Sequence, residues 1–289
     1  MTHLSRTTTQ PFRGTVAVRL GALTPDRLRG PEFIRLYPDT YVGADADLTD
    51  IRLRVQALHF WSRGHGIVAG PLAALAHGAD CPWDDREVIL GRRCRNPPDG
   101  VRVRVDAVPP EERVITLGAH VTSPVRTAFD LARRSPLVEA VAAVDALAFR
   151  RKFTADDLRA LAEAHPGARG LTQVREVLEL MNPLAQSLPE TRLRLGLLAR
   201  GVPPAVCQHP VRLLTGRFVH PDLSWPHAKL ALEYDGPSHR DITGQNRDAF
   251  RDGDLFDVGW TVVRVTSAMV HDPTAFDRLA VRVMRRLAA

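Results

Sequence analysis

Two short extended segments near residue 225 each carry acidic residues, and together they limit the folds and the chemistry open to this chain. Pro221 fixes its own backbone φ and favours extended geometry before it, so a strand is expected to start at Asp222. The segment Lys229–Asp235 alternates with the period of two that is typical of a strand, which places Glu233 and Asp235 on one face. If the two segments form a hairpin, Asp222 lies beside Glu233.

Two carboxylates at one point of a sheet suggest a site for a hard divalent cation. Mg²⁺ and Mn²⁺ use one or two carboxylates together with waters and substrate phosphate oxygens. We therefore predict that Asp222 and Glu233 hold Mg²⁺ or Mn²⁺. In the alternative interpretation the acids are solvated or salt-bridged, and Asp235-Gly236 is an ordinary turn dipeptide. Burying two unpaired acids on an apolar strand is costly, which favours the metal interpretation.

The flanking sequence predicts a complete α/β unit. Ser187 and Glu190 have the spacing of a capping box, and the helix that they start is expected to end at Arg200. Further expected elements are a helix over 242–258, a strand over 260–266 and a closing helix over 269–287. This order predicts an α/β sandwich over residues 184–289.

Residues 184–289 resemble the restriction-endonuclease-like fold of the PD-(D/E)XK superfamily, in particular the very-short-patch repair endonuclease branch. The matching positions are Glu190, Pro221-Asp222, Glu233-Tyr234-Asp235-Gly236, His239, the Arg247 to Arg251 helix and Gly259-Trp260. The resemblance implies a catalytic set of Glu190, Asp222, Glu233, Asp235 and His239, a metal held by Asp222 and Glu233, and DNA-backbone contacts from Arg247 and Arg251.

The chain departs from the family pattern at one position. Asp235 stands where the family has a lysine that orients or deprotonates the attacking water, and a carboxylate cannot supply that positive charge. His239 is the candidate replacement, because a histidine can act as a base near neutral pH. In the alternative interpretation His239 is an exposed loop residue.

Composition and charge narrow the class of protein. The 289 residues are 44% apolar and 25% charged, as in ordinary globular proteins, and are enough for two domains. The net charge of +6 agrees with a nucleic-acid partner. No apolar run is long enough for a membrane span, and the three cysteines lack a Cys-x-x-Cys pair. These features predict a cytoplasmic protein.

The sequence of the N-terminal two-thirds of the chain predicts an α+β region followed by a helical middle. Thr24 and Pro25 start a short helix, and it is the one convincing helix before Phe33. Short strands of a modest sheet follow, and residues 121–179 are expected to be helical. We expect three divisions: an N-terminal one over 1–120 with a degenerate winged helix and a small sheet, a helical connector over 121–183 and the nuclease-like domain over 184–289.

Residues 60–180 resemble the AbiEi-type antitoxins of abortive-infection systems. The segments that carry this resemblance are Thr122 to Ala132 and Gly70 to Gly78. Antitoxins of this type often begin with a winged helix-turn-helix that binds promoter DNA, so the resemblance implies DNA and a toxin as partners.

Two functions remain in competition at this point. The first is a metal-dependent DNA endonuclease, acting in defence or repair, which hydrolyses phosphodiester bonds. The alternative is a DNA-binding antitoxin or transcriptional regulator whose nuclease-like domain is catalytically inactive. Expected partners are DNA and either a toxin or a second copy of the chain. A purely structural C-terminal domain fits the acidic residues on the apolar strand poorly.

Overall fold

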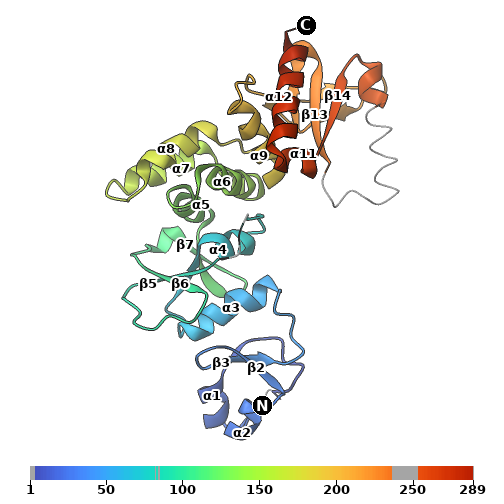
Figure 1. The fold of residues 1–289 in the computed structure, drawn as a ribbon. Helices are drawn as coiled ribbons and strands as arrows, with labels where there is room; N and C mark the ends of the chain where they lie inside the picture. The colour runs from blue at the N-terminus through green and yellow to red at the C-terminus, as the bar shows by residue number, and fades with distance from the viewer. Residues whose placement is uncertain (1–3, 82, 84, 236–252, 289) are drawn as a thin grey trace.

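The computed structural model describes residues 4–81, 83, 85–235 and 253–288. Its elements follow one another along the chain from a small N-terminal unit, through a sheet and a group of helices, to a C-terminal α/β unit (Figure 1). Within the described part, no helix is both long and apolar enough to cross a membrane. The architecture is mixed α and β, as predicted.

The N-terminal unit is a three-stranded antiparallel sheet with two short helices. Its elements are β1 (Phe12–Arg13), α1 (Gly14–Arg19), α2 (Pro25–Arg29), β2 (Phe33–Tyr37) and β3 (Thr40–Gly43). The strand order is β1-β3-β2. Helix α2 starts as predicted, since the Thr24 side chain accepts a hydrogen bond from the Arg27 N–H at 3.2 Å. The prediction of a single helix in this unit was wrong, because α1 precedes α2.

The central sheet has five strands in the order β6-β5-β4-β8-β7. Helix α3 (Ile51–Trp61) leads into β4 (Ile67–Ala69), and α4 (Gly70–Ala76) follows β4 directly. The other elements of this region are β5 (Arg86–Leu90), β6 (Val101–Val105), the 3₁₀ turn η1 (Pro110–Glu112), β7 (Arg113–Thr116) and β8 (Ala119–Thr122). Since β8 includes residues 121 and 122, the predicted helical stretch starts slightly later than expected.

Four helices form the middle of the chain. They are α5 (Pro124–Ala132), α6 (Leu137–Arg151), α7 (Ala155–Ala164) and α8 (Leu171–Leu180). Helix α6 lies at the centre, because nine consecutive residues from Ala140 to Ala148 are buried. Its small alanine side chains allow neighbouring helices to approach closely.

The C-terminal unit is a four-stranded sheet in the order β14-β13-β12-β9, with helices packed against it. Its elements are α9 (Leu188–Leu198), β9 (Val206–Cys207), β10 (Val211–Arg212), β11 (Phe218–Val219), β12 (Leu223–Trp225), the 3₁₀ turn η2 (Pro226–Ala228), β13 (Leu230–Asp235), β14 (Thr261–Thr266), α11 (Ser267–His271) and α12 (Pro273–Leu287). Strands β12 and β13 form the predicted hairpin, in which Leu223 faces Leu232. Strand β14 runs parallel to β13.

The expected single closing helix is wrong, because the chain forms two helices that are separated at Asp272. The Asp272 carboxylate accepts hydrogen bonds from the N–H groups of Thr274 at 2.9 Å and Ala275 at 3.3 Å, and Pro273 occupies the first turn. An N-cap followed by proline starts a new helix. Most of the helix expected over 242–258 lies outside the described residues, although residues 253–257 are helical.

A buried carboxylate joins the middle helices to the C-terminal unit. Asp145 of α6 is 1% exposed and accepts hydrogen bonds from the backbone N–H of Asn182 at 2.6 Å and the Thr191 hydroxyl at 2.9 Å. It also pairs with Arg194 of α9 at 2.8 Å. Burial raises the pKa of Asp145 to about 6, against the opposing effect of Arg194. The junction is therefore polar, and its Asp145 and Thr191 are buried.

Candidate functional site

Asp222 lies at the start of β12, where two neighbouring chain segments bind its carboxylate. One oxygen accepts the backbone N–H of Tyr234 on β13 at 2.8 Å. The other accepts the side-chain amide of Gln208 at 3.3 Å. These contacts fix the Asp222 side chain at the edge between β12 and β13, as the hairpin prediction required.

Glu190 approaches the same point from the first turn of α9. Its backbone N–H donates to the Ser187 hydroxyl at 3.3 Å, and its carboxylate accepts the Ser187 hydroxyl at 2.8 Å and the Gln186 N–H at 3.0 Å. The Gln208 amide lies 3.5 Å from Glu190, so it is placed between the two carboxylates. Burial, followed by the nearby charge of Asp222, raises the pKa of Glu190 to about 7.

The two acids of β13 occupy different environments. Glu233 is 4% exposed and lies in register with Arg264 of β14, whereas Asp235 is exposed at the strand end. Because Leu223 faces Leu232, the antiparallel register puts Asp222 and Glu233 on one face of the hairpin. His239, Arg247 and Arg251, also predicted as site residues, lie outside the described residues.

The carboxylate donors of this site are of the kind that binds a hard cation, but they are few in number. Within the described residues there is no group of three or more His, Cys, Asp or Glu side chains that could hold a metal ion. Glu190 and Asp222 nevertheless present carboxylate oxygens on either side of one amide. The pKa of Glu190 is raised mainly by burial and further by the charge of Asp222, and a divalent cation would remove the repulsion between the two charges.

Gln208 is the member of this site that the sequence prediction missed. Its backbone has a φ of +52°, which is uncommon for a residue other than glycine. Its N–H donates to the Asp222 carbonyl at 3.3 Å, and its own carbonyl lies 3.1 Å from the Nδ1 of His220. The left-handed turn thereby directs the Gln208 amide towards both carboxylates.

A second candidate site is the exposed face of α2 in the N-terminal unit. Leu28 is buried in the core of that unit, whereas Arg27 and Arg29 are exposed. Each arginine pairs with an exposed carboxylate at 2.7 Å, from Glu32 and Asp26 respectively. Exposed pairs of this kind contribute little to stability, so both guanidinium groups can be redirected to a ligand at low cost.

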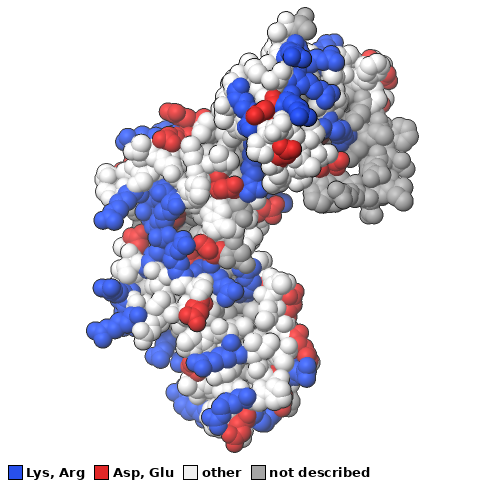
Figure 2. All heavy atoms as spheres, viewed as in Figure 1, with Lys and Arg blue, Asp and Glu red and all other residues white. Residues whose placement is uncertain are grey.

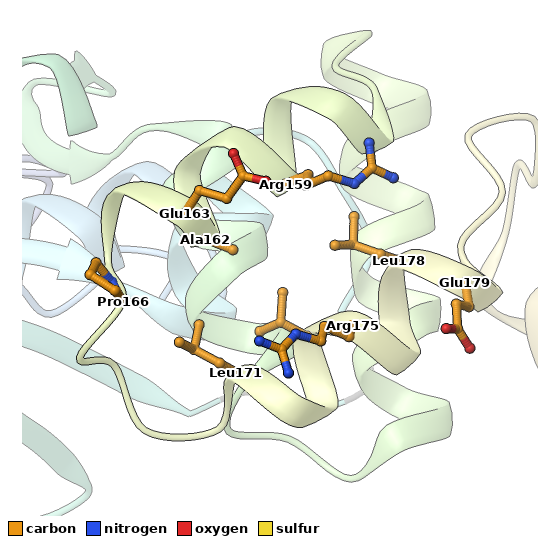
Figure 3. Close-up of a pocket in the computed structure, with 9 residues that line it drawn as sticks. Arg159, Ala162, Glu163, Pro166, Leu171, Arg175, Leu178 and Glu179 are labelled. Carbon is orange, nitrogen blue, oxygen red and sulfur yellow. The ribbon is translucent and has the colours of Figure 1, made fainter.

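Basic side chains and one large hollow also lie outside these two sites. Figure 2 shows basic side chains on the viewed face of every part of the molecule, and they gather over α12 and also in the middle of the molecule. A hollow of about 800 Å³ lies between α7 and α8 (Figure 3). Its lining combines apolar side chains such as Leu171 and Leu178 with the charged Arg159 and Arg175, and includes no histidine, cysteine or serine. The carboxylates of Glu163 and Glu179 also line it.

The comparisons with known proteins bear on the central region. Residues 68–180 match the AbiEi antitoxin C-terminal domain. The matched segment begins inside β4 and ends with α8, so it comprises the central sheet and the four middle helices. This confirms the antitoxin-like resemblance of the region, whereas the nuclease-like resemblance of residues 184–289 stays a prediction.

Two relatives extend over most of the chain. They are uncharacterized proteins of Mycobacterium tuberculosis, one from strain CDC 1551 / Oshkosh and one from strain ATCC 25618 / H37Rv. Each is 28% identical over 257 residues, which is 88% of this chain and 92% of the relative. The similarity thus includes parts of the N-terminal and C-terminal units as well as the antitoxin-like region.

Proposed function

We propose that this chain is a DNA-binding regulator of the antitoxin type, in which the N-terminal unit contacts DNA. The observation that carries the proposal is the position of a β1–α1–α2–β2–β3 unit directly ahead of the region that matches the AbiEi antitoxin C-terminal domain. Two consecutive helices followed by a hairpin are the parts of a winged helix-turn-helix, whose second helix enters the major groove.

The geometry of the N-terminal unit supports this role. Gly14 at the start of α1 is required by close packing, since a Cβ there would lie 2.6 Å from the Tyr41 ring and 2.7 Å from Leu28. The hairpin turn is fixed by Asp39, whose carboxylate accepts from Arg13 at 2.8 Å and from the Thr15 N–H at 2.7 Å. Helix α1 and the β2–β3 hairpin, which would be the wing, are therefore held together, as a rigid DNA-contacting surface requires.

Replacing both Arg27 and Arg29 with alanine should weaken binding of the full chain to its operator by about tenfold or more, because a specific arginine contact is worth about 1–3 kcal/mol. The operator is first sought in the DNA upstream of the chain's own coding sequence, by protection from nuclease digestion. Affinity is then measured by fluorescence anisotropy. Stability should change little, since both ion pairs are exposed.

Arg159→Ala is the matched control, because Arg159 also forms an exposed ion pair with an acid three residues away. It should leave DNA affinity unchanged. The proposal fails if the wild-type chain protects no site, or if the Arg27/Arg29 double variant binds as tightly as the wild type. The matched domain is named as an antitoxin, so we further propose a toxin as the cognate protein; a homodimer stays a prediction.

The carboxylate site favours a second candidate function, metal-dependent hydrolysis of DNA phosphodiester bonds. The supporting observation is that Glu190 and Asp222 approach the same amide while Glu233 lies opposite Asp222. The order of α9, the four-stranded sheet and α12 is compatible with the restriction-endonuclease-like sandwich that the sequence resembles. The exposed carboxylate of Asp235 at the family's lysine position weighs against this function.

In this second candidate, Asp222 and Glu233 would hold Mg²⁺ or Mn²⁺ and Glu190 would act from the outer shell or on a second ion. Such an ion lowers the pKa of bound water and neutralises phosphate charge. The half-buried amide of Gln208 would keep both carboxylates oriented.

A cleavage assay tests this candidate. Plasmid DNA is incubated with the full chain and Mg²⁺ or Mn²⁺, and the same is done with Asp222→Asn, which retains an acceptor for the Tyr234 N–H. Cleavage is expected with the wild type, and a decrease of at least about tenfold in Asp222→Asn, because the variant loses a ligand charge. Asp156→Asn, an exposed change on α7, is the control. Intact plasmid in every reaction would exclude the hydrolase and leave the DNA-binding proposal standing.

A further inference from the structure

The outer face of α12 carries a compact group of arginines, which we call the α12 arginine face. It consists of Arg278, Arg282, Arg285 and Arg286. These side chains line one shallow hollow on the helix surface, and the concentration of basic groups over α12 is visible in Figure 2. None of the four forms an ion pair with another described residue. The one acid in the hollow, Asp277, is paired with Arg200 at 2.6 Å.

The opposite face of α12 is buried in the hydrophobic core. Phe276, Leu279, Ala280 and Val283 are each at most 3% exposed and pack on the sheet and on α9. Gly196 of α9 allows this approach, since a Cβ there would lie 2.6 Å from the Phe276 ring. Because this face is buried in protein, it is not available for a lipid surface, unlike the apolar face of a membrane-binding amphipathic helix. The exposed apolar side chains of α12 are those of Val281 and Met284.

Helix stability explains part of the arginine face but not all of it. Arg285 and Arg286 lie in the last turn, where a cation is favourable beside the helix C-terminus. Arg278 and Arg282 lie in the preceding turns and have no such role. A rise of about 1.5 Å per residue spreads the four guanidinium groups over about 12 Å of helix, so they can contact several successive phosphates of one strand.

We propose that the α12 arginine face binds the DNA phosphate backbone and forms a second, sequence-independent contact in addition to the N-terminal unit. The charge of the face is complementary to phosphate, and guanidinium forks bind phosphate oxygens in pairs. The inference rests on the proposed DNA-binding function. It adds that the C-terminal unit supplies a separate part of the DNA affinity, and that this part decreases steeply as the salt concentration rises.

The test replaces all four arginines of the face with glutamine in the full chain. Binding to a mixed-sequence DNA duplex is measured by fluorescence anisotropy across a series of salt concentrations. The slope of log affinity against log salt should become shallower by about 3 to 4, since each phosphate contact contributes about 0.9. A version with four lysines should retain most of the wild-type slope, and thermal melts identify any variant that fails to fold.

The control removes the same charge elsewhere, by replacing four exposed arginines with glutamine: Arg150 and Arg151 of α6, Arg169 of the loop between α7 and α8, and Arg175 of α8. It should leave the slope near the wild-type value. An equal decrease in both variants, an unchanged slope in the α12 variant, or binding of the face to phosphatidylserine vesicles in place of DNA would each overturn the inference. A wild-type chain that binds no DNA at any salt would instead overturn the proposed function.

Discussion

Replacing Arg126 with alanine is expected to lower the free energy of unfolding by about 3–5 kcal/mol, a typical cost of removing one partner from a buried ion pair. Arg126 is 1% exposed and contacts three carboxylates, at 2.6 Å from Asp106 and 3.1 Å from Asp130, with a short contact to Glu112. The variant would leave the buried Asp130 and Glu112 and the half-buried Asp106 without their shared cation.

The surrounding groups compensate for this loss only in part. Asp130 keeps ion pairs with Arg133 at 2.7 Å and Arg134 at 3.2 Å. Glu112 keeps the His165 ring at 2.6 Å, which supplies a charge only when that histidine is protonated. Glu112 belongs to η1, whereas Arg126 is on α5, so the cluster joins the loop beside the sheet to the first middle helix.

Urea denaturation followed by far-ultraviolet circular dichroism measures this effect. Arg126→Met is the companion variant, because it retains the aliphatic stem and removes only the charge. It should be nearly as unstable as the alanine variant. Arg159→Ala, which breaks an exposed pair, should change stability by less than about 1 kcal/mol. An Arg126→Met protein as stable as the wild type would show that the charge cluster does not hold this region together.

The Arg126 cluster also accounts for the motif Thr122 to Ala132, by which the sequence resembles the antitoxin family. Ser123 caps α5 by accepting the Arg126 N–H at 3.2 Å, and the Thr127 hydroxyl lies 2.7 Å from that of Thr122. Thr122, Arg126 and Thr127 are buried and Ser123 is half-buried, so the motif specifies how α5 attaches to the sheet. Its role is structural, and the exposed DNA-contact candidates lie in other parts of the chain.

Local patterns predicted much of the C-terminal unit. The alternation of Lys229–Asp235 depends on strand geometry alone, and β13 follows it with Leu232 in one core cluster and Ala231 in another. The helix caps at Thr24 and Ser187 could also be predicted from the sequence, since each depends on a hydrogen bond between residues three apart. The start of α12 at Asp272 also has a local signal in the sequence, an N-cap followed by proline. The apolar spacing that continues across Asp272 instead favoured one long helix.

The remaining features depend on contacts distant in sequence. Helix α1 begins with Gly14 and contains β-branched residues, which have low helix propensity, and it forms because tertiary packing outweighs that propensity. Gln208 reaches carboxylates that are 14 and 18 residues away, and Asp145 reaches Thr191 across 46 residues. No periodic pattern in the sequence encodes such partners, so the polar joints of the fold could not be predicted.

Replacing Glu190 with glutamine should remove a large part of the pH dependence of stability in the C-terminal unit. In the native state the pKa of Glu190 is raised from 4.5 to about 7 by burial and by the charge of Asp222. The folded protein therefore holds the proton more tightly than the unfolded chain. This contribution to stability is complete below about pH 4.5 and is lost as the pH rises through about 7, by about 3 kcal/mol in total.

Glutamine stays neutral and retains an oxygen for the Gln186 N–H, so the variant should be the more stable protein above about pH 7. Urea denaturation, followed by tryptophan fluorescence over a series of pH values, gives the two profiles. Asp145→Asn is the control, because its pKa of about 6 confines its effect to a lower window and leaves the final decrease towards pH 7 in place. A Glu190→Gln profile parallel to that of the wild type would contradict the assignment.

The same stability profiles, measured with added Mg²⁺, distinguish the two candidate functions, because only the hydrolase requires a cation at this site. A cation held by Asp222 and its neighbours would favour ionised Glu190 and would stabilise the native state in proportion to its binding. Added Mg²⁺ should then restore the stability that the wild type loses near pH 7, and should do so less in Glu190→Gln. If Mg²⁺ changes neither profile, the raised pKa reflects two acids held together around Gln208 without an ion. That result would favour the DNA-binding regulator over the hydrolase.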